Sequence, residues 1–212
     1  MESEGVRPLP TRSLDRFQRT RRLAILLMLI AAGAFLLFCS APPPGGALHE
    51  TVEITGLMLI AIAILGRLWC TLYIGGRKNT EIVARGPYSL TRNPLYVFSA
   101  IGAAGVGAQT GSVTVALLFG MVTTLAFLVV IQREEGFLEA TFGSAYDAYR
   151  ARVPRFVPRF SGYEGAGLVT VDPSRLYATL FDGLVFLAAI PVFEGIEWLQ
   201  ESGALPVLVR LV

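Results

Sequence analysis

The sequence predicts an all-α fold, a polytopic integral membrane bundle of about five transmembrane helices. Its composition is the first reason, because 53% of the 212 residues are hydrophobic and only 16% are charged, unlike an average soluble domain. The second reason is a series of long apolar runs, since about 20 apolar residues cross the hydrocarbon core as a helix. Helices are expected rather than open strands, because lipid cannot satisfy unpaired backbone N–H and C=O groups.

The expected transmembrane segments follow one another with short loops between them. They are residues 23–39, 55–74, 95–108, 113–131 and 176–193. Arg67 is the only charge in the second segment, and the third segment is short and rich in Gly and Ala. Asp182 interrupts the fifth segment, which either spans the membrane or lies in it as a shallow helix. We expect a basic segment over residues 1–22, followed by a single membrane-embedded domain over residues 23–212.

The distribution of Lys and Arg predicts which loops face the cytoplasm. Basic residues occur in the N-terminal segment, in the loop before residue 95 and after residue 131, whereas the loops 41–50 and 109–112 contain none. Because short cytoplasmic loops retain the basic residues, we expect the N-terminus on the cytoplasmic side of a bacterial-type inner membrane. The net charge of +2 gives no reason to expect a nucleic-acid partner, and the sequence leaves the oligomeric state open.

Two polar stretches flank the apolar hairpin formed by the third and fourth segments. The first is residues 85–96, and the second is residues 134–160, which begins with a pair of glutamates. Apolar residues at helical spacing over 135–150 predict an amphipathic helix that lies on the membrane or caps a pocket. The repeated Val-Pro-Arg-Phe over 153–160 predicts an extended strap. Both stretches are expected on the cytoplasmic side, so we expect them to form one pocket for a polar cofactor beside the lipid.

These stretches carry motifs in a fixed order along the chain. The motifs are Gly86-Pro87-Tyr88, Thr91-Arg92-Asn93-Pro94-Leu95-Tyr96, Glu134-Glu135, Phe142-Gly143 with Tyr146 and Tyr149, and Val153-Pro154-Arg155. Their order and spacing over residues 80–160 resemble the isoprenylcysteine carboxyl methyltransferase family and its phospholipid methyltransferase relatives. Asn93 stands where that family often has His. An amide keeps a donor and an acceptor but does not titrate near neutral pH, so we expect no proton transfer at Asn93.

The resemblance implies a methyltransferase that takes its methyl group from S-adenosylmethionine and gives it to a lipophilic acceptor from the bilayer. An Arg would bind the donor's carboxylate, and a Glu would bind its ribose hydroxyls, amine or sulfonium. Positioning would supply most of the catalysis, because the sulfonium is already activated. The catalytic positions implied are Arg92, Asn93 and Glu135. The cofactor-binding positions implied are Tyr88, Arg92, Asn93, Pro94, Tyr96, Gly105, Gly107, Glu134, Glu135, Tyr146, Tyr149 and Arg155.

Several of these residues also have simpler interpretations. Gly105 and Gly107 are explained by helix packing as well as by contact with a cofactor. The acidic pair Glu134 and Glu135 also fits a solvated helix end. Arg67 either extends towards the membrane interface or pairs with one of these glutamates or with an anionic substrate.

Two other classes of function remain open from the sequence. Sterol reductases have a similar helical domain, so an NADPH-dependent membrane reductase is one alternative, and a non-catalytic membrane scaffold is the other. The small size of the chain favours methyl transfer. So does the acidic pair, because binding the phosphates of NADPH would call for an extra basic cluster instead. His49, the only histidine, and the cysteines Cys39 and Cys70 lie apart without metal-ligand spacing, so no metal site is expected.

Overall fold

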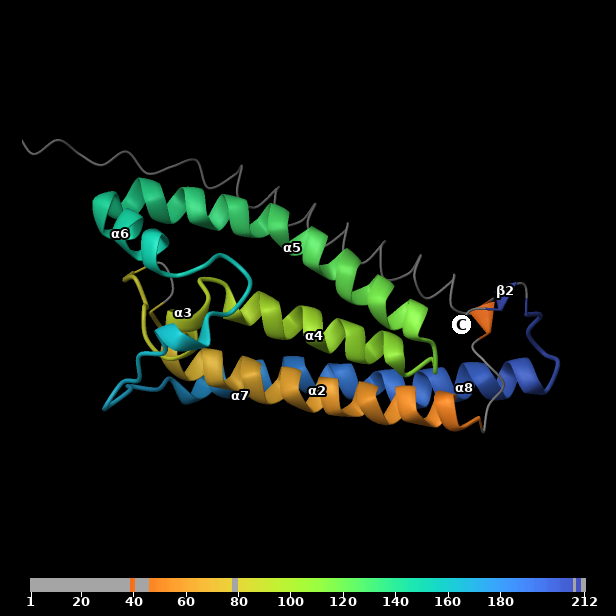
Figure 1. Ribbon diagram of the computed structural model, residues 1–212. Helices are drawn as coiled ribbons and strands as arrows, with labels where there is room; N and C mark the ends of the chain where they lie inside the picture. Colours follow the sequence, from red (N-terminus) through yellow and green to blue (C-terminus); the bar gives the residue numbers. More distant parts are fainter. Residues whose placement is uncertain (1–38, 41–45, 78–79, 208, 211–212) are drawn as a thin grey trace, which may run out of the picture.

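Figure 1 shows a bundle of long helices, with short helices and loops gathered at one end. The computed structural model describes residues 39–40, 46–77, 80–207 and 209–210. Its helices are α2 (Ala47–Ile74), α3 (Pro87–Leu90), α4 (Pro94–Ala108), α5 (Val113–Phe142), α6 (Ser144–Arg152), α7 (Pro173–Leu184) and α8 (Ala189–Glu201), with 3-10 turns η1 (Phe160–Gly162) and η2 (Val185–Ala188). The strands β1 (Cys39–Ser40) and β2 (Val209–Arg210) form a short parallel pair. Apart from this pair, the described part of the chain confirms the all-α prediction.

Three helical stretches are long and apolar enough to cross a membrane, namely Ala47–Ile74, Val113–Phe142 and Pro173–Glu201. Helix α4 is apolar but has only 15 residues, about 22 Å at a rise of 1.5 Å per residue. These helices match the second to fifth predicted segments and confirm an integral membrane protein. The first predicted segment, 23–39, lies outside the described residues except for Cys39 in β1.

Helix α4 lies between α2 and α5, and α7 packs against α2 (Figure 1). Glycines allow the close approach of α4 to its neighbours. A Cβ on Gly105 would lie 2.8 Å from the carbonyl oxygen of Gly56 in α2, and a Cβ on Gly107 would lie 2.7 Å from that of Val115 in α5. Because no side chain fits at these distances, the small residues of α4 join the two long helices, as small residues do in membrane bundles.

The helix of the fourth segment continues beyond its predicted end. Helix α5 runs without a break to Phe142, so Glu134 and Glu135 lie inside it and their interpretation as a helix end is wrong. The amphipathic helix predicted over 135–150 is divided between the end of α5 and α6, and the α6 part lies beside the pocket. The helix ends at Gly143 and α6 begins after it. The φ of 52° at Gly143 is easily adopted only by glycine.

The fifth predicted segment forms α7 and α8, joined by the 3-10 turn η2. Pro191 explains this turn, because it has no N–H to donate to the Leu187 carbonyl and its ring would clash with that group. Tighter 3-10 bonding then replaces the α-helical pattern locally. The whole stretch, Pro173–Glu201, is long enough to span a membrane, which favours the spanning interpretation despite Asp182 in α7.

Candidate functional site

The polar motif between α2 and α4 folds as a tight turn at one end of the bundle. Gly86 has a φ of 61°, and a Cβ there would lie 2.4 Å from the Tyr73 ring, so this position requires glycine. Pro87 and Pro94 stand in the first turns of α3 and α4, where the missing N–H has no helical partner to lose. The turn thereby places residues 88–93 at the N-terminal end of α4.

The strap, residues 153–160, lies against this turn without regular helix over most of its length. The Arg92 backbone N–H donates to the Pro154 carbonyl at 2.8 Å. The Thr91 hydroxyl donates to the Arg155 carbonyl at 3.0 Å. The strap is therefore irregular, with bends at residues 153 and 155–157 rather than the fully extended conformation predicted from the repeated prolines, and hydrogen bonds from the motif turn fix its position.

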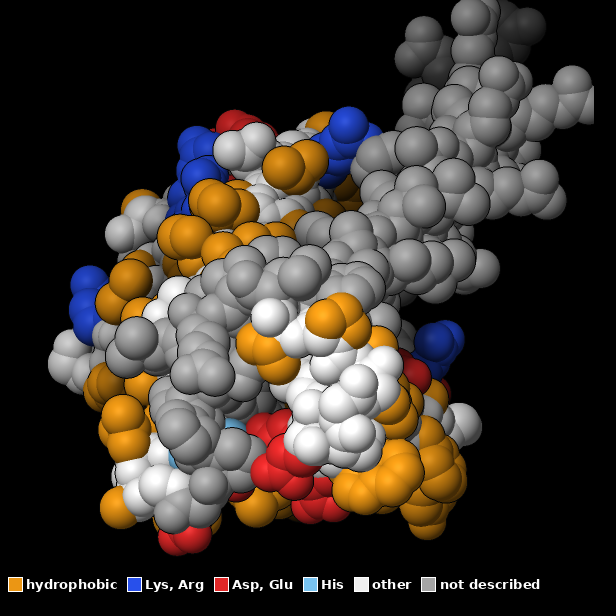
Figure 2. Space-filling view, turned by 90° about the vertical axis from the view of Figure 1, so that its right-hand side faces the viewer, with side chains coloured by type: hydrophobic (Ala, Val, Ile, Leu, Met, Phe, Trp, Pro, Cys, Tyr) orange, Lys and Arg blue, Asp and Glu red, His pale blue; other side chains and the backbone are white. Residues whose placement is uncertain are grey.

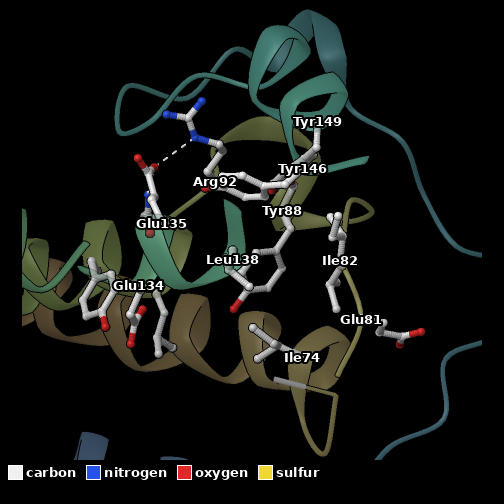
Figure 3. Close-up of a pocket in the computed structure, with 14 residues that line it drawn as sticks. Ile74, Glu81, Ile82, Tyr88, Arg92, Glu134, Glu135, Leu138, Tyr146 and Tyr149 are labelled. Carbon is white, nitrogen blue, oxygen red and sulfur yellow. Dashed lines mark hydrogen bonds and ion pairs between the residues drawn. The ribbon is translucent and has the colours of Figure 1, made fainter. Parts of the chain in front are cut away.

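Glu135 of α5 lies at the centre of a group of polar side chains (Figure 3). Its Oε1 accepts hydrogen bonds from Arg92 Nε at 3.0 Å and Asn93 Nδ2 at 3.3 Å. Its Oε2 accepts from Arg155 Nε at 3.0 Å and lies 2.7 Å from Arg155 Nη2. The Asn93 amide also donates to the Arg155 carbonyl at 3.1 Å, so it makes no cap bond at the start of α4. We call these four residues the Glu135 cluster.

Burial and charge explain why the Glu135 cluster is stable. The side chains of Glu135 and Arg92 are only 9% and 8% exposed, so each charge requires a partner. Arg155 is 47% exposed, and the cluster retains one net positive charge. Arg92 Nη1 also donates to the carbonyls of Arg150 and Val153 at 3.0 Å and 3.2 Å. The cluster therefore joins α4, α5, α6 and the strap.

A pocket lies beside the Glu135 cluster, between the ends of α2, α4, α5 and α6. Its enclosed part has a volume of about 100 Å³, and the empty space reaches about 780 Å³ only when the open mouth is included. Aromatic and aliphatic side chains make up most of its walls, and Glu81 and Glu134 add carboxylates. A mostly apolar wall with a few polar groups is typical of a ligand site.

The hydroxyl of Tyr88 is the most distinctive polar group in this pocket. Figure 3 shows the ring extending from α3 into the pocket, near Leu138, and the buried hydroxyl has no hydrogen-bond partner. Burial raises the pKa of Tyr88 well above its usual range, so the hydroxyl keeps its proton. An unsatisfied buried polar group costs about 1–3 kcal/mol. A ligand that forms a hydrogen bond with this hydroxyl would therefore recover that free energy.

Two further tyrosines of α6 form the wall next to Tyr88. The Tyr149 hydroxyl donates to the Tyr88 carbonyl at 2.8 Å, which fixes α6 against α3. Burial, and then the charge of Glu135, raise the pKa of Tyr146 to about 12. Burial likewise raises the pKa of Tyr149. Both rings therefore remain neutral walls of the pocket at physiological pH.

Most of the cofactor-binding residues predicted from the sequence line this one pocket. They are Tyr88, Arg92, Asn93, Tyr96, Glu134, Glu135, Tyr146 and Tyr149. Pro94 is buried at the start of α4, and Arg155 contacts Glu135 without lining the pocket. The pocket is also lined by residues that the motifs did not indicate, namely Ile74, Glu81, Ile82, Val83, Leu95 and Leu138. The available signal was the apolar pair Ile82 and Val83 in an otherwise polar loop.

Gly105 and Gly107 do not line the pocket. They lie about 15 Å along α4 from Tyr96, at 1.5 Å per residue, where the backbones of α2 and α5 leave no space for a Cβ. The predicted cofactor contact is therefore corrected to helix packing, the other interpretation open from the sequence.

Arg67 has partners inside the bundle. Its Nη1 donates to the Ser99 hydroxyl of α4 at 2.6 Å, and its guanidinium carbon lies 5.8 Å from the centre of the Phe186 ring. Asp182 supplies an opposing charge from α7. The pairing predicted with Glu135 is wrong, because the Glu135 cluster already holds that carboxylate.

The fold and the pocket together define a class, a helical integral membrane protein with a mostly apolar pocket at one end of its bundle. A family model for phospholipid methyltransferases matches residues 51–145. No solved structure gives a significant match.

Three relatives extend this comparison. A cobalt-zinc-cadmium resistance protein of Cupriavidus metallidurans is 35% identical over 95% of this chain and 93% of its own length. A nickel-cobalt-cadmium resistance protein of Alcaligenes xylosoxydans xylosoxydans is 37% identical over 74% of this chain and 73% of its own. The protein-S-isoprenylcysteine O-methyltransferase of Schizosaccharomyces pombe is 33% identical over 40% of this chain and 37% of its own. The chain belongs to the phospholipid and isoprenylcysteine methyltransferase family of membrane proteins, which confirms the resemblance seen in its motifs.

Proposed function

We propose that the protein is an S-adenosylmethionine-dependent methyltransferase that methylates a lipophilic acceptor at the membrane boundary. The pocket carries the proposal, because its mostly apolar walls with a few polar groups are typical of a ligand site and it contains the unpaired Tyr88 hydroxyl. The family supports the reaction class, since its model and the fission-yeast relative are named as methyltransferases.

The residues of the pocket fit the chemistry of this donor. S-adenosylmethionine supplies an activated methyl group on a sulfonium, and it also carries an adenine, a ribose, an amine and a carboxylate. Carboxylates such as Glu81 and Glu134 suit the cationic groups and the ribose hydroxyls. The tyrosine and aliphatic walls suit the adenine, and the Tyr88 hydroxyl offers a hydrogen bond. The excess positive charge of the Glu135 cluster lies at Arg155, outside the pocket wall, so Arg92 is the lining cation that the donor's carboxylate would meet.

In this proposal the three catalytic positions act by positioning. Both oxygens of Glu135 are engaged by arginines, and Asn93 does not titrate near neutral pH, so neither is suited to proton transfer. Together with Arg92 they fix α4, α5 and the strap relative to one another. Lining residues from these elements then stay in place, and holding two reactants in line supplies much of the rate of such a transfer.

The acceptor is proposed to reach the pocket from the bilayer. Helix α5 exposes large apolar side chains along its length, among them Leu117, Leu125 and Val129, as a lipid-facing helix does. At the pocket the aliphatic side chains Leu95 and Leu138 continue this apolar surface. We further propose that the pocket faces the cytoplasm, because the basic loops lie at this end, and that residues 23–212 work as one domain.

The electrostatics of the pocket argue against the reductase alternative. NADPH carries several phosphates, which proteins usually bind with arginines or lysines. Among the described residues that line the pocket, Arg92 is the only cation, and Glu135 neutralises it at 3.0 Å. Glu81, which pairs with Arg77 at 3.4 Å, and Glu134 add no positive charge to the walls, so the lining residues suit a sulfonium better than phosphates.

Ligand-dependent stabilisation of the purified protein tests the proposal. S-adenosylmethionine and S-adenosylhomocysteine are expected to raise the Tm in detergent, because a ligand that binds the folded state stabilises it, and NADPH is not. Tyr88→Phe keeps the ring and removes the unpaired hydroxyl, so it should weaken S-adenosylmethionine binding by about 5-fold to 10-fold, the value of one hydrogen bond.

Tyr177→Phe is the matched control, because the Tyr177 side chain is exposed on α7, away from the pocket. It should bind S-adenosylmethionine like the wild type. Selective stabilisation by NADPH would favour the reductase, and no response to any of these ligands would favour the scaffold.

A second candidate concerns the process that the enzyme serves. A relative named as a cobalt-zinc-cadmium resistance protein matches over 93% of its own length, which favours a role of this chain in metal resistance. Growth of a deletion strain on cobalt, zinc and cadmium salts, with and without the wild-type gene, tests this role. Unchanged metal tolerance of the deletion strain would exclude it.

A further inference from the structure

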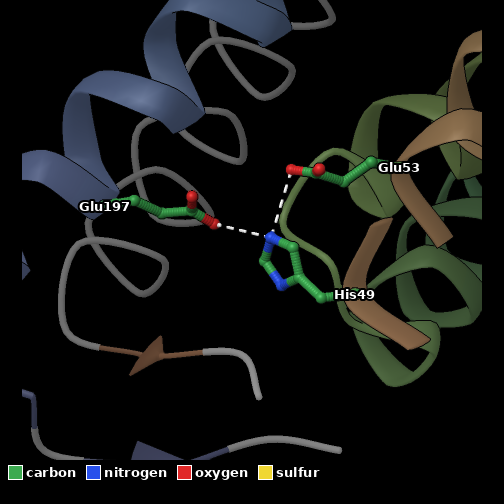
Figure 4. Close-up of side chains that lie close together, drawn as sticks. All are labelled: His49, Glu53 and Glu197. Atoms are coloured by element: carbon green, nitrogen blue, oxygen red, sulfur yellow. Dashed lines mark ion pairs between the residues drawn. The ribbon is translucent and has the colours of Figure 1, made fainter. Parts of the chain in front are cut away.

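Three side chains with metal-ligand chemistry meet at the end of the bundle opposite the pocket. His49 and Glu53 are one turn apart on α2, and Glu197 comes from α8 (Figure 4). The distance along α2 from His49 to Ile74, beside the pocket, is about 38 Å at 1.5 Å per residue. This exceeds the hydrocarbon thickness of about 30 Å, so the two sites are far enough apart to lie on opposite sides of a membrane.

The geometry of this group suits one small cation. His49 Nε2 lies 3.2 Å from Glu53 Oε1 and 3.4 Å from Glu197 Oε1, and the three ligand atoms all lie within 4.8 Å of one another. In a tetrahedral site with bonds of about 2.1 Å, neighbouring ligand atoms are about 3.4 Å apart. Small side-chain rotations therefore suffice to place one ion in contact with all three.

The imidazole of His49 is directed into this group by its surroundings. The side chain is 4% exposed, and its Nδ1 is buried without a hydrogen-bond partner. The ring packs on Gly111, where a Cβ would lie 2.0 Å from Nδ1 and where φ is +68°. The two carboxylates are thus the only polar contacts described for the ring, and its Nε2 points between them.

Acidic side chains outnumber basic ones on the described helices at this end of the bundle. Glu50, Glu194 and Glu201 add to Glu53 and Glu197, and Figure 2 shows acidic side chains gathered at this end next to the histidine. The stretches 46–66, 93–132 and 176–209 contain no Lys or Arg. One imidazolium can neutralise only one of the two carboxylates that contact it, whereas a divalent cation neutralises both.

We propose that His49, Glu53 and Glu197 bind a divalent transition-metal ion of the cobalt, nickel or zinc type. An imidazole nitrogen favours these ions over Mg²⁺ and Ca²⁺, which prefer oxygen ligands throughout. The three protein ligands leave further coordination positions for water or another ligand. Because the ligands come from α2 and α8, the ion also joins these two helices.

Metal titration of the full-length protein tests the site. Protein in detergent is freed of metal with a chelator and titrated with Co²⁺, whose visible absorption reports the ligands, and Zn²⁺ binding is measured by equilibrium dialysis. We expect one ion per chain. Residues that only orient ligands change metal affinity by about 10-fold to 100-fold, so loss of a ligand in Glu197→Gln or His49→Gln should weaken binding by at least about 100-fold.

The controls are Glu50→Gln and Glu201→Gln, which remove a carboxylate from the same two helices at exposed positions. Both should bind Co²⁺ like the wild type. Equal affinity of Glu197→Gln and Glu50→Gln would overturn the site, and so would the absence of Co²⁺ binding by the wild type, leaving only an ion pair. The wild-type measurement decides even if His49→Gln fails to fold, and it is independent of methyl transfer.

Discussion

The guanidinium of Arg155 binds one oxygen of the Glu135 carboxylate through two nitrogens, Nη2 at 2.7 Å and Nε at 3.0 Å. The two residues are 20 positions apart in the sequence, one in α5 and the other in the strap, with α6 between them. Arg92 holds the other carboxylate oxygen at 3.0 Å. One carboxylate thus connects the membrane helix, the motif turn and the strap beside the pocket.

Replacing Glu135 with Gln should loosen the strap and abolish binding of S-adenosylmethionine. The change leaves the buried Arg92 without a counter-charge, and breaking a buried ion pair costs about 3–5 kcal/mol. Limited proteolysis should then cut the strap faster, while Tm falls. Glu139→Gln is the control, because its ion pair with Arg150 is half exposed and worth only about 0–1 kcal/mol. Equal proteolysis of both variants would contradict the central role of Glu135.

Asn93→Asp should destabilise the protein in a pH-dependent way. The Asn93 amide donates to Glu135 Oε1 and to the Arg155 carbonyl, whereas an aspartate would face both with an oxygen. Arg92 and Arg155 would lower the pKa of the new carboxyl, but it would face two oxygens directly, Glu135 Oε1 and the Arg155 carbonyl, and with burial we expect these to raise the pKa overall. A raised pKa means that stability is present at low pH and is lost as pH rises through that pKa. The variant should therefore be closer to wild type at pH 5 than at pH 8.

Thermal melts of wild type, Asn93→Asp and Asn93→Ala at the two pH values measure this effect. Asn93→Ala has no titrating group, so its loss of stability, about 1–3 kcal/mol for the unsatisfied partners, should be the same at both. An Asn93→Asp variant with no dependence on pH would show that the amide does not act as a donor here.

The helices and the membrane class were predictable because their signal is local. Apolar runs of sufficient length define spanning helices wherever they pack, and α2, α5 and α7–α8 follow them. The end of α5 was not predictable in the same way. Helix α5 continues through the acidic pair to Phe142. Arg92 and Arg155, which lie outside this helix, neutralise Glu135, and the local sequence of α5 does not show these partners.

The candidate site was predicted in part. The residues that could not be predicted reach it through contacts between distant parts of the sequence. The motif residues are close in sequence, so their meeting with Glu135 followed from the hairpin. Ile82 and Val83 stand out as an apolar pair in a polar loop, but the sequence does not define the path by which that loop brings them to the pocket. Glu197 meets His49 across the bundle, which explains why spacing in the sequence gave no indication of a metal site.

Alkaline pH should destabilise the α6 wall of the pocket. Burial and Glu135 raise the pKa of Tyr146 to about 12, above the usual value of about 10. The stability from this group is therefore fully present below pH 10 and is lost as pH rises from 10 to about 12. Tyr146→Phe should lose less stability over this interval than the wild type, measured as Tm. Identical losses would show that the Tyr146 hydroxyl does not titrate against the fold.

Two glycine substitutions should separate packing from donor binding. Gly105→Ala places a Cβ 2.8 Å from the Gly56 carbonyl oxygen, so we expect a loss of about 1–3 kcal/mol from overpacking. Gly136→Ala has nothing within 4 Å, and inside α5 it should stabilise by about 0.5–1 kcal/mol. Both variants should bind S-adenosylmethionine with wild-type affinity at a temperature where both are folded, because neither glycine lines the pocket. A selective loss of donor affinity in Gly105→Ala would contradict the assignment of Gly105 to helix packing. It would favour a contact between Gly105 and the cofactor.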